Sequence, residues 1–542
     1  MKFRMKFPLS ALATMTLAAL LAACGGAAKE AAVAPGKIVF ALQSEPDGYD
    51  PGITNNSFAS PFMTQLFEGL VTYDAKGEIV PGNAESWTIS PDGKTYAFKL
   101  RKGLKWSNGK PLTAKDYVYS LLRVLDPKTG ARYADMLTVY IVGAEEYYAG
   151  TGPKDAVAVK AVDDLTLQIT LKEPAPYYLG ILAMWVYSPV YQEAVEASPE
   201  RWTMDPATFI SNGPFKVASM KLGEGVVLQK NENYWNAASV KLSEINFRFI
   251  LEPATALSAF EKGEIDGFRE VPASDIPRLR TGSDSLHILP AFGTTFYDVN
   301  TTKKPYSDAR VRKALALALD RDELIDNVLQ APSTPTLALV APGYVFGGAD
   351  FTAAHAKYGF SSKADVEGAR KLLAEAGYPD GKGFPVLELS YYTNATVKKM
   401  VEAMQQMWEK NLGIKVKIKV QDWAIYYADI QALNYDVGAM GWGGDYLHPM
   451  TFLQLFTSNS TNNLVGYKNP EYDDLIAKTI VETDPAKAVE LMHRAEDIFV
   501  RDQPVISLYS RSNTIMMAPH VKNWALTALA NLYFKDAYVE KK

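Results

Sequence analysis

The sequence predicts a mixed α/β protein of at least two lobes. Residues 386–420 have the pattern of a strand, a helix and a second strand, which form a β-α-β unit with a right-handed crossover. Alternation of apolar with other side chains predicts half-buried strands at 96–100, 165–171 and 245–249. The chain has 542 residues, of which 48% are hydrophobic and 22% charged. This length exceeds what one small domain needs, so we expect more than one core.

Hydrophobic spacing identifies the helices. Between 397 and 408 the apolar residues recur every three or four positions, and this methionine and aromatic stripe is typical of a core-facing helix rather than a cofactor site. A second helix follows the capping residues Ser307 and Asp308, with its apolar face at 311, 314, 315, 318 and 319. A third runs from about Lys363 to Ala376 and ends at Gly377.

The first 36 residues predict export and anchoring. A basic start (Lys2 to Lys6) and an apolar stretch lead into Leu21-Ala22-Ala23-Cys24, so we expect residues 1–23 to be a signal peptide. A transmembrane helix is disfavoured because polar residues interrupt the stretch and small residues end it. The motif resembles the lipobox of bacterial lipoproteins, which implies a lipid on Cys24, the only cysteine, and a flexible tether over 24–36. The expected location is the periplasm or cell surface, lipid-anchored to a bacterial membrane.

Most catalytic, metal and cofactor motifs are missing from the sequence. The five histidines are scattered without a zinc-binding spacing, and no Gly-x-Ser-x-Gly elbow occurs. Residues 91–93 before Lys94 have the pattern of a hairpin turn rather than a phosphate loop. The formal charge of −5 argues against binding of nucleic acid. The sequence motifs therefore give no support to an enzyme, a metal site or a cofactor, but a glycosidase whose two carboxylates come from distant segments stays open.

Residues 436–446 are the segment most suggestive of a binding site. Gly441, Trp442 and Gly443 place a small, open backbone beside an aromatic ring, and Asp445 adds a carboxylate. Such a carboxylate can hold an amine through charge-assisted hydrogen bonds. Alternatively, the segment is a tight turn in which Asp445 caps a helix over 449–456. The residues alone favour neither interpretation.

A series of short motifs gives the chain a family resemblance from about residue 37 to its end. They are Ser44-Glu45-Pro46, Phe67-Glu68-Gly69-Leu70, Pro81-Gly82-Asn83-Ala84-Glu85-Ser86-Trp87, Trp106-Ser107-Asn108-Gly109, Asn212-Gly213-Pro214-Phe215, Gly263-Glu264-Ile265-Asp266, the run from Asp308 to Leu315, and the run from Lys371 to Tyr378. In this order they resemble the extracellular solute-binding proteins of family 5, the oligopeptide and dipeptide receptors of ABC importers.

The resemblance implies a periplasmic binding protein fold of type II, in which two lobes close on a ligand about a hinge and an extra domain is inserted. Lobe I would comprise residues 37–72, 193–296 and 511–542. The inserted domain would span 73–192, and lobe II would span 297–510.

The resemblance also assigns site residues. Asp445 corresponds to the carboxylate that holds the peptide α-ammonium, and Gly441, Trp442 and Gly443 match the backbone run that pairs with the peptide. The facing segment would contain Ser44 and Glu45, and the matching cleft aromatics are Tyr133 and Trp423.

One departure from the family pattern concerns the peptide carboxylate. Well-known oligopeptide binders have a basic residue where this chain has Ala439, and the other apparent counterparts, Val397 and Ile430, are apolar. Either the carboxylate is held elsewhere, or the peptide extends out of the cleft, or the ligand is another amine.

The implied function is capture of oligopeptides and their delivery to an ABC permease with separate ATPase subunits, by a monomer tethered through its lipid. Such a receptor is not an enzyme, and we expect no catalytic residue, no metal and no cofactor. The alternatives are a receptor of the same family for an oligosaccharide, a nickel chelate or an opine, a secreted hydrolase, and a holdase-type chaperone. Ligand length and side-chain preference stay open.

Overall fold

The computed structural model describes residues 36–540, apart from residue 47 and residues 55–57. The predicted signal peptide and Cys24 lie outside the described residues, as does the tether apart from residue 36. Within the described part, no helix has the length and apolar character needed to cross a membrane.

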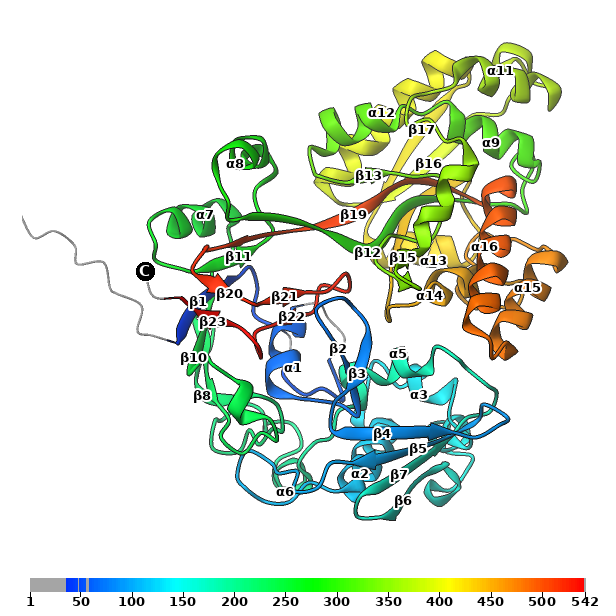
Figure 1. Ribbon diagram of the computed structural model, residues 1–542. Coiled ribbons are helices and arrows are strands. Elements are labelled where there is room, and N and C mark those ends of the chain that lie inside the picture. The colour runs from blue at the N-terminus through cyan, green and yellow to red at the C-terminus, as the bar shows by residue number, and fades with distance from the viewer. Residues whose placement is uncertain (1–35, 47, 55–57, 541–542) are drawn as a thin grey trace, which may run out of the picture.

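One sheet of eleven strands extends through two bodies of the chain, and two long strands join these bodies (Figure 1). The joining strands are β12 (Leu286–Val299) and β19 (Val505–Met517), which pair antiparallel along most of their length. Their register shifts between Pro290 and Thr294 and again between Thr295 and Phe296. Two adjacent strands with such an irregularity form a narrow hinge.

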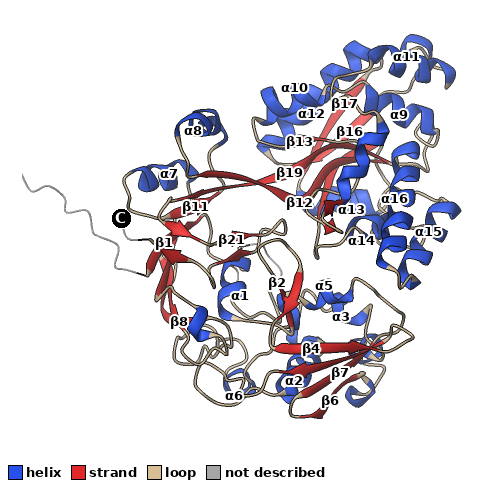
Figure 2. Cartoon of the chain, in the orientation of Figure 1, coloured by secondary structure: helices blue, strands red, loops and turns tan. Residues whose placement is uncertain are grey.

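The first body carries one half of the sheet, in the order β11-β1-β10-β9-β8 beyond β19. The strands are β1 (Lys37–Leu42), β8 (Phe215–Lys221), β9 (Gly225–Lys230), β10 (Glu244–Phe249) and β11 (Gly267–Arg269). Strand β1 is parallel to both β10 and β11, so their carboxyl ends share one edge. Helices α1 (Ser60–Leu66), α7 (Pro253–Glu261) and α8 (Ile276–Gly282) belong to this body (Figure 2).

A separate sheet lies below the first body in Figure 1, with the order β4-β5-β7-β6. Its strands are β4 (Ala84–Ile89), β5 (Thr95–Leu100), β6 (Val159–Asp163) and β7 (Thr166–Thr170). Helices α2 (Ala114–Val124), α3 (Asp135–Thr138), α4 (Ala144–Tyr148), α5 (Tyr178–Leu182) and α6 (Gln192–Ala197) accompany it. The predicted turn before Lys94 is confirmed, since Gly93 has a φ of 71° between β4 and β5. The exact domain boundaries given above stay a prediction.

The second body carries the other half of the large sheet, in the order β17-β16-β18-β12-β19. The predicted β-α-β unit is confirmed as β16 (Leu387–Tyr392), α12 (Ala395–Leu412) and β17 (Val416–Gln421), with parallel strands. Strand β18 (Val437–Gly443) lies between β16 and β12. The remaining helices are α9 (Ala309–Leu317), α10 (Arg321–Glu323), α11 (Val366–Glu375), α13 (Trp423–Gln431), α14 (Met450–Leu453), α15 (Pro470–Val481) and α16 (Pro485–Asp502).

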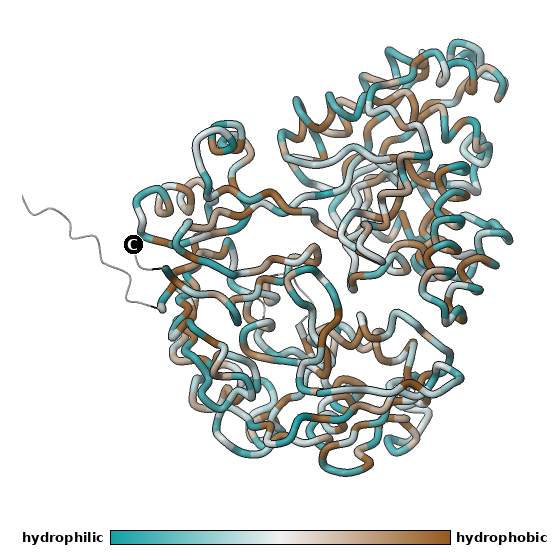
Figure 3. Tube along the Cα trace, in the orientation of Figure 1, coloured by the Kyte–Doolittle hydropathy of each residue, from teal (hydrophilic) through white to brown (hydrophobic). Residues whose placement is uncertain are grey.

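Caps and buried stripes explain why these segments are helical. The Asp308 side chain accepts a hydrogen bond from the backbone N–H of Arg310 at 2.9 Å and so starts α9, as predicted. Helix α11 begins at Val366, later than predicted, because Asp365 caps it by accepting from the N–H of Gly368 at 2.8 Å. The apolar stripe of α12 belongs to the buried core of the second body. Figure 3 shows apolar segments, in brown, among the helices and strands of this body.

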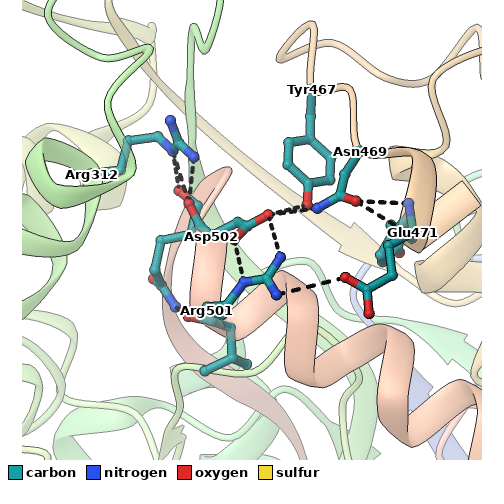
Figure 4. A network of polar contacts seen from close by, with 9 residues as sticks. Arg312, Tyr467, Asn469, Glu471, Arg501 and Asp502 are labelled. Atoms are coloured by element: carbon teal, nitrogen blue, oxygen red, sulfur yellow. Dashed lines mark hydrogen bonds and ion pairs between the residues drawn. The ribbon is translucent and has the colours of Figure 1, made fainter.

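A polar network fixes the point at which β19 leaves α16 (Figure 4). Arg312 donates to the backbone carbonyls of Asp502 and Gln503 at 2.9 and 3.0 Å. The Asp502 carboxylate accepts from the Tyr467 hydroxyl at 2.7 Å and from the Asn469 amide at 2.8 Å. Because these groups hold the last turn of α16, they also set the position of the hinge strand that follows it.

Candidate functional site

Strand β18 has a partly open edge where the sequence predicts a binding segment. It pairs with β12 along its whole length, from Val437 to Gly443. On its other edge, however, β16 pairs only with Val437 and Gly438. Among the described strands, none covers the rest of that edge. The Tyr426 hydroxyl donates to the carbonyl of Ala439 at 2.8 Å, so the backbone that can accept an added strand begins at Met440.

Asp436 accounts for the way β16 and β18 diverge. Its buried carboxylate accepts hydrogen bonds from the backbone N–H of Glu388 at 2.9 Å and from the Tyr306 hydroxyl at 3.2 Å. Lys303 completes the set with an ion pair. These contacts fix the start of both strands, whereas no equivalent link among the described residues joins them beyond Gly438.

Asp445 lies just beyond β18, close to the domain that carries α3. Its carboxyl group is partly buried, and burial together with the nearby Asp135 raises its pKa to about 7. Among the described residues, no cation forms an ion pair with either carboxylate. Two acids that approach each other from different domains without a cation form a site that favours a positively charged group.

The alternative in which Asp445 caps a helix is not supported. A helical turn does form at Met450–Leu453, but no side chain caps its start. The Asp445 contact in this region is made by its backbone N–H, which donates to the Thr451 hydroxyl at 3.2 Å. The carboxylate thus remains available to a ligand.

Aromatic side chains surround these groups. Tyr133 lies near enough to Asp445 for that carboxylate to contribute to its raised pKa, after burial, and its ring contacts Trp185 edge to face at 6.2 Å between centroids. Trp423, the first residue of α13, is 51% exposed, stacks on Tyr427 and contacts Tyr392 edge to face. Tyr133 therefore lies near Asp445, whereas no contact among the described residues joins Trp423 to residues 441–445, and its assignment to the ligand site stays a prediction.

The glycines and Trp442 occupy the open strand as the sequence indicates. Gly441 is opposite Thr295 and Gly443 is opposite Gly293 in β12. The half-buried Trp442 packs against the core and donates from its indole N–H to the Thr451 hydroxyl at 3.4 Å. This tryptophan stabilises the strand and the turn that presents Asp445.

Ser44 and Glu45 follow β1 at the carboxyl edge of the first body. The Ser44 hydroxyl donates to the carbonyl of Glu45 at 3.0 Å, and the Glu45 carboxylate accepts from the backbone N–H of Gly223 at 2.9 Å. No contact joins them to β18 among the described residues. Their assignment to the ligand site stays a prediction.

Three further residues at this site were not identified from the sequence. Asp135 lies two positions after Tyr133 in a segment without periodicity, and Tyr392 ends a strand like many other aromatic residues. Arg511 is a lone cation in the middle of a long strand. Only the three-dimensional arrangement brings them to the open edge.

The two bodies, the strand hinge between them and the open edge with its acid pair define a two-lobed protein that captures a ligand between its lobes. In agreement with this class, residues 78–464 match the model for bacterial extracellular solute-binding proteins, family 5 (middle). The oligopeptide-binding protein OppA of Bacillus subtilis is 36% identical over 506 residues, covering 92% of this chain and 91% of OppA. The chain therefore belongs to the family 5 extracellular solute-binding proteins.

Solved structures support the same fold and indicate the arrangement of the lobes. The unliganded open form of the murein tripeptide-binding protein MppA superposes with a TM-score of 0.82 at 31% identity, covering 93% of this chain and 97% of MppA. Haemophilus influenzae OppA in complex with RPPGFSPFR gives 0.72 at 32% identity, covering 94% and 99%. The higher score for the open form agrees with lobes that stand apart here.

Proposed function

We propose that this protein captures peptides between its lobes by their α-ammonium group and delivers them to an ABC permease whose ATPase subunits are separate. The observation that carries the proposal is the pair formed by Asp445 and Asp135. Their mutual repulsion is relieved when a cation enters between them, and a peptide with a free amino terminus supplies one. The names of the relatives reported above, oligopeptide-binding and murein tripeptide-binding proteins, point to the same ligand class.

The peptide main chain would add to the open edge of β18. Gly441, Trp442 and Gly443 would pair with it, since main-chain hydrogen bonds hold a ligand without selecting its side chains. When the lobes close, Ser44 and Glu45 would approach from the first body, and Tyr133 and Trp423 would cover the ligand from either side. This division of roles fits a receptor that accepts varied sequences.

The remaining assignments follow from the sequence and the family. We place the mature protein outside the cytoplasmic membrane as a monomer, anchored by a lipid on Cys24 after removal of residues 1–23. Lobe I would comprise 37–72, 193–296 and 511–542, lobe II 297–510, and the inserted domain 73–192. The protein would bind its ligand without turning it over.

Thermal melting of residues 25–542 with added peptides tests the proposal. The protein is first unfolded and refolded to remove ligand carried through purification. Peptides of two to eight residues are then compared with their N-acetylated forms. A ligand at 100 times its dissociation constant should add about 2.7 kcal/mol to the free energy of unfolding. Free peptides are expected to raise the melting temperature, and acetylated peptides are not.

Other outcomes identify which part of the proposal fails. If free and acetylated peptides stabilise equally, peptides bind but Asp445 does not hold the amine. If no peptide shifts the melt, the ligand class is wrong, and oligosaccharides, nickel chelates and opines are the next library. Peptide cleavage during the assay would contradict a role without catalysis.

A further inference from the structure

Arg511 is a cation at the ligand-binding edge with no acidic partner. It lies in β19 at the hinge and is exposed, and its Nε donates to the Thr295 hydroxyl at 3.0 Å. No carboxylate among the described residues forms an ion pair with it. The buried Arg312 of α9, by comparison, donates to the backbone carbonyls of Asp502 and Gln503. A guanidinium without an acid at a binding edge is a candidate anion site.

Two glycines give the Arg511 side chain its path across the sheet. The strand order is β18-β12-β19, so the side chain must cross β12 to reach β18. A β-carbon on Gly293 would lie 3.3 Å from Cδ of Arg511, and one on Gly441 would collide with its guanidinium. The guanidinium therefore lies over Gly441, at the strand whose other edge is open.

The surroundings of the guanidinium suit a carboxylate. Tyr392, at the end of β16, is close enough to interact electrostatically with Arg511 across the open edge. Ala439, two positions before Gly441 in β18, is 3% exposed and packs in the core of the second body. Ile430 is fully buried, so neither residue can supply the missing charge. Arg511 brings a cation to the same face from a different strand.

The distance between Arg511 and Asp445 limits the length of a peptide that can contact both. Three residues lie between Gly441 and Asp445, so the Cα atoms of these two residues are at most about 14 Å apart, at 3.3–3.6 Å per residue. An extended peptide advances about 3.4 Å per residue. After allowance for a hydrogen bond at each end, two or three residues fit between an ammonium at Asp445 and a carboxylate at Arg511.

We infer that Arg511 binds the α-carboxylate of a peptide of two or three residues, whose amino terminus is held at Asp445. This inference rests on the proposed function and adds the carboxylate anchor and the ligand length. Arg511, Ser510 and Ser512 also line a pocket of about 800 Å³ between the lobes, whose walls include Arg280 of α8 and Asp326. Peptides that continue into this pocket would forgo the ion pair with Arg511.

Calorimetric titration with trialanine, trialanine amide and hexaalanine tests the inference on three proteins. They are the wild type, Arg511→Gln, and the control Arg280→Gln, which removes an exposed cation of the same pocket away from β18. The wild type and Arg280→Gln should bind the free acid about 10- to 100-fold more tightly than the amide. Arg511→Gln should bind both within about twofold, with an unchanged melting temperature in the absence of peptide.

Each contrary result has a distinct meaning. Three results would overturn the inference and leave peptide capture intact. They are equal affinity of the wild type for the acid and the amide, tighter binding of hexaalanine than of trialanine, and a preserved preference for the acid in Arg511→Gln. Failure of the wild type to bind any free peptide, in this titration and in the melting series, would overturn the proposed function and the inference with it.

Discussion

Asp445 is the residue on which recognition of the ligand most depends. Asp445→Asn keeps the shape of the side chain and removes its charge, so the ammonium loses its ion pair. We expect the affinity for trialanine to fall about 10- to 100-fold, measured by calorimetric titration. Asp135→Asn is the comparison, and because Asp135 is exposed the expected loss is only about 2- to 5-fold. A variant Asp445→Asn that binds as tightly as the wild type would remove this residue from the site.

The pKa of Asp445 gives peptide binding a pH dependence. Burial and Asp135 raise this pKa to about 7, so the carboxyl group is increasingly protonated below pH 7 when no ligand is bound. An ammonium pairs with the ionised form, so binding at low pH must release a proton. The affinity should therefore fall about 10- to 50-fold from pH 7 to pH 5. Titrations in buffers of different ionisation enthalpy should also detect the released proton, and Asp445→Asn should show a flat profile.

In strand β18, alanine substitutions at Gly441 and Gly443 form a matched pair of variants that tests the packing. A β-carbon on Gly441 would lie 2.9 Å from the carbonyl oxygen of Thr294 and against the Arg511 guanidinium, whereas one on Gly443 would meet nothing within 4 Å. Gly441→Ala should therefore lower the free energy of unfolding of the ligand-free protein by about 1–3 kcal/mol, and Gly443→Ala should not. Chemical denaturation measures both. Equal stability of the two variants would contradict the described packing over β18.

Strand β12 contains a buried acid, Asp298, that affects how the stability of the fold depends on pH. Asp298 is 2% exposed, and burial raises its pKa to about 8. The folded protein thus binds a proton that the unfolded chain releases near pH 4, so this group makes the fold less stable as the pH rises from 4 to 8. Asp298→Asn should raise the free energy of unfolding at pH 8 by about 5 kcal/mol relative to its effect at pH 4, since each pKa unit corresponds to about 1.4 kcal/mol. A pH-independent effect would contradict this assignment.

Individual elements could be predicted where local signals and burial agree. The β-α-β unit at 386–420 and the helix after Asp308 formed as predicted, because periodicity, caps and packing favour the same structure. The open edge of β18 could not be predicted, since it depends on Asp436 fixing two strands that then diverge. No pattern within one strand reports which partner covers its edge.

For the whole molecule, sequence reasoning reached the fold class but only part of the site. The alternation of strands and helices indicates an α/β protein, whereas the order of a sheet shared by two lobes depends on contacts between distant segments. Asp135 and Asp445 are 310 positions apart, and Arg511 meets Gly441 across an intervening strand. The resemblance supplied Asp445 and Tyr133, but the second acid and the free cation required the structure.

The hinge of two strands allows the lobes to move as bodies. Strands β12 and β19 change register between Pro290 and Thr294, and the superposition on an open relative indicates lobes that stand apart. A ligand held by charges on both sides of the gap should favour the closed arrangement by its differential affinity for it. Closure would bury the peptide and bring Ser44 and Glu45 toward β18.

Small-angle X-ray scattering of residues 25–542 with trialanine and with N-acetyltrialanine tests capture and closure together. If the lobes close on a peptide held by its amine, saturating trialanine reduces the radius of gyration and the acetylated peptide at the same concentration does not. An unchanged radius of gyration with a peptide shown by titration to be bound would contradict closure. An equal decrease with both peptides would contradict the amine anchor.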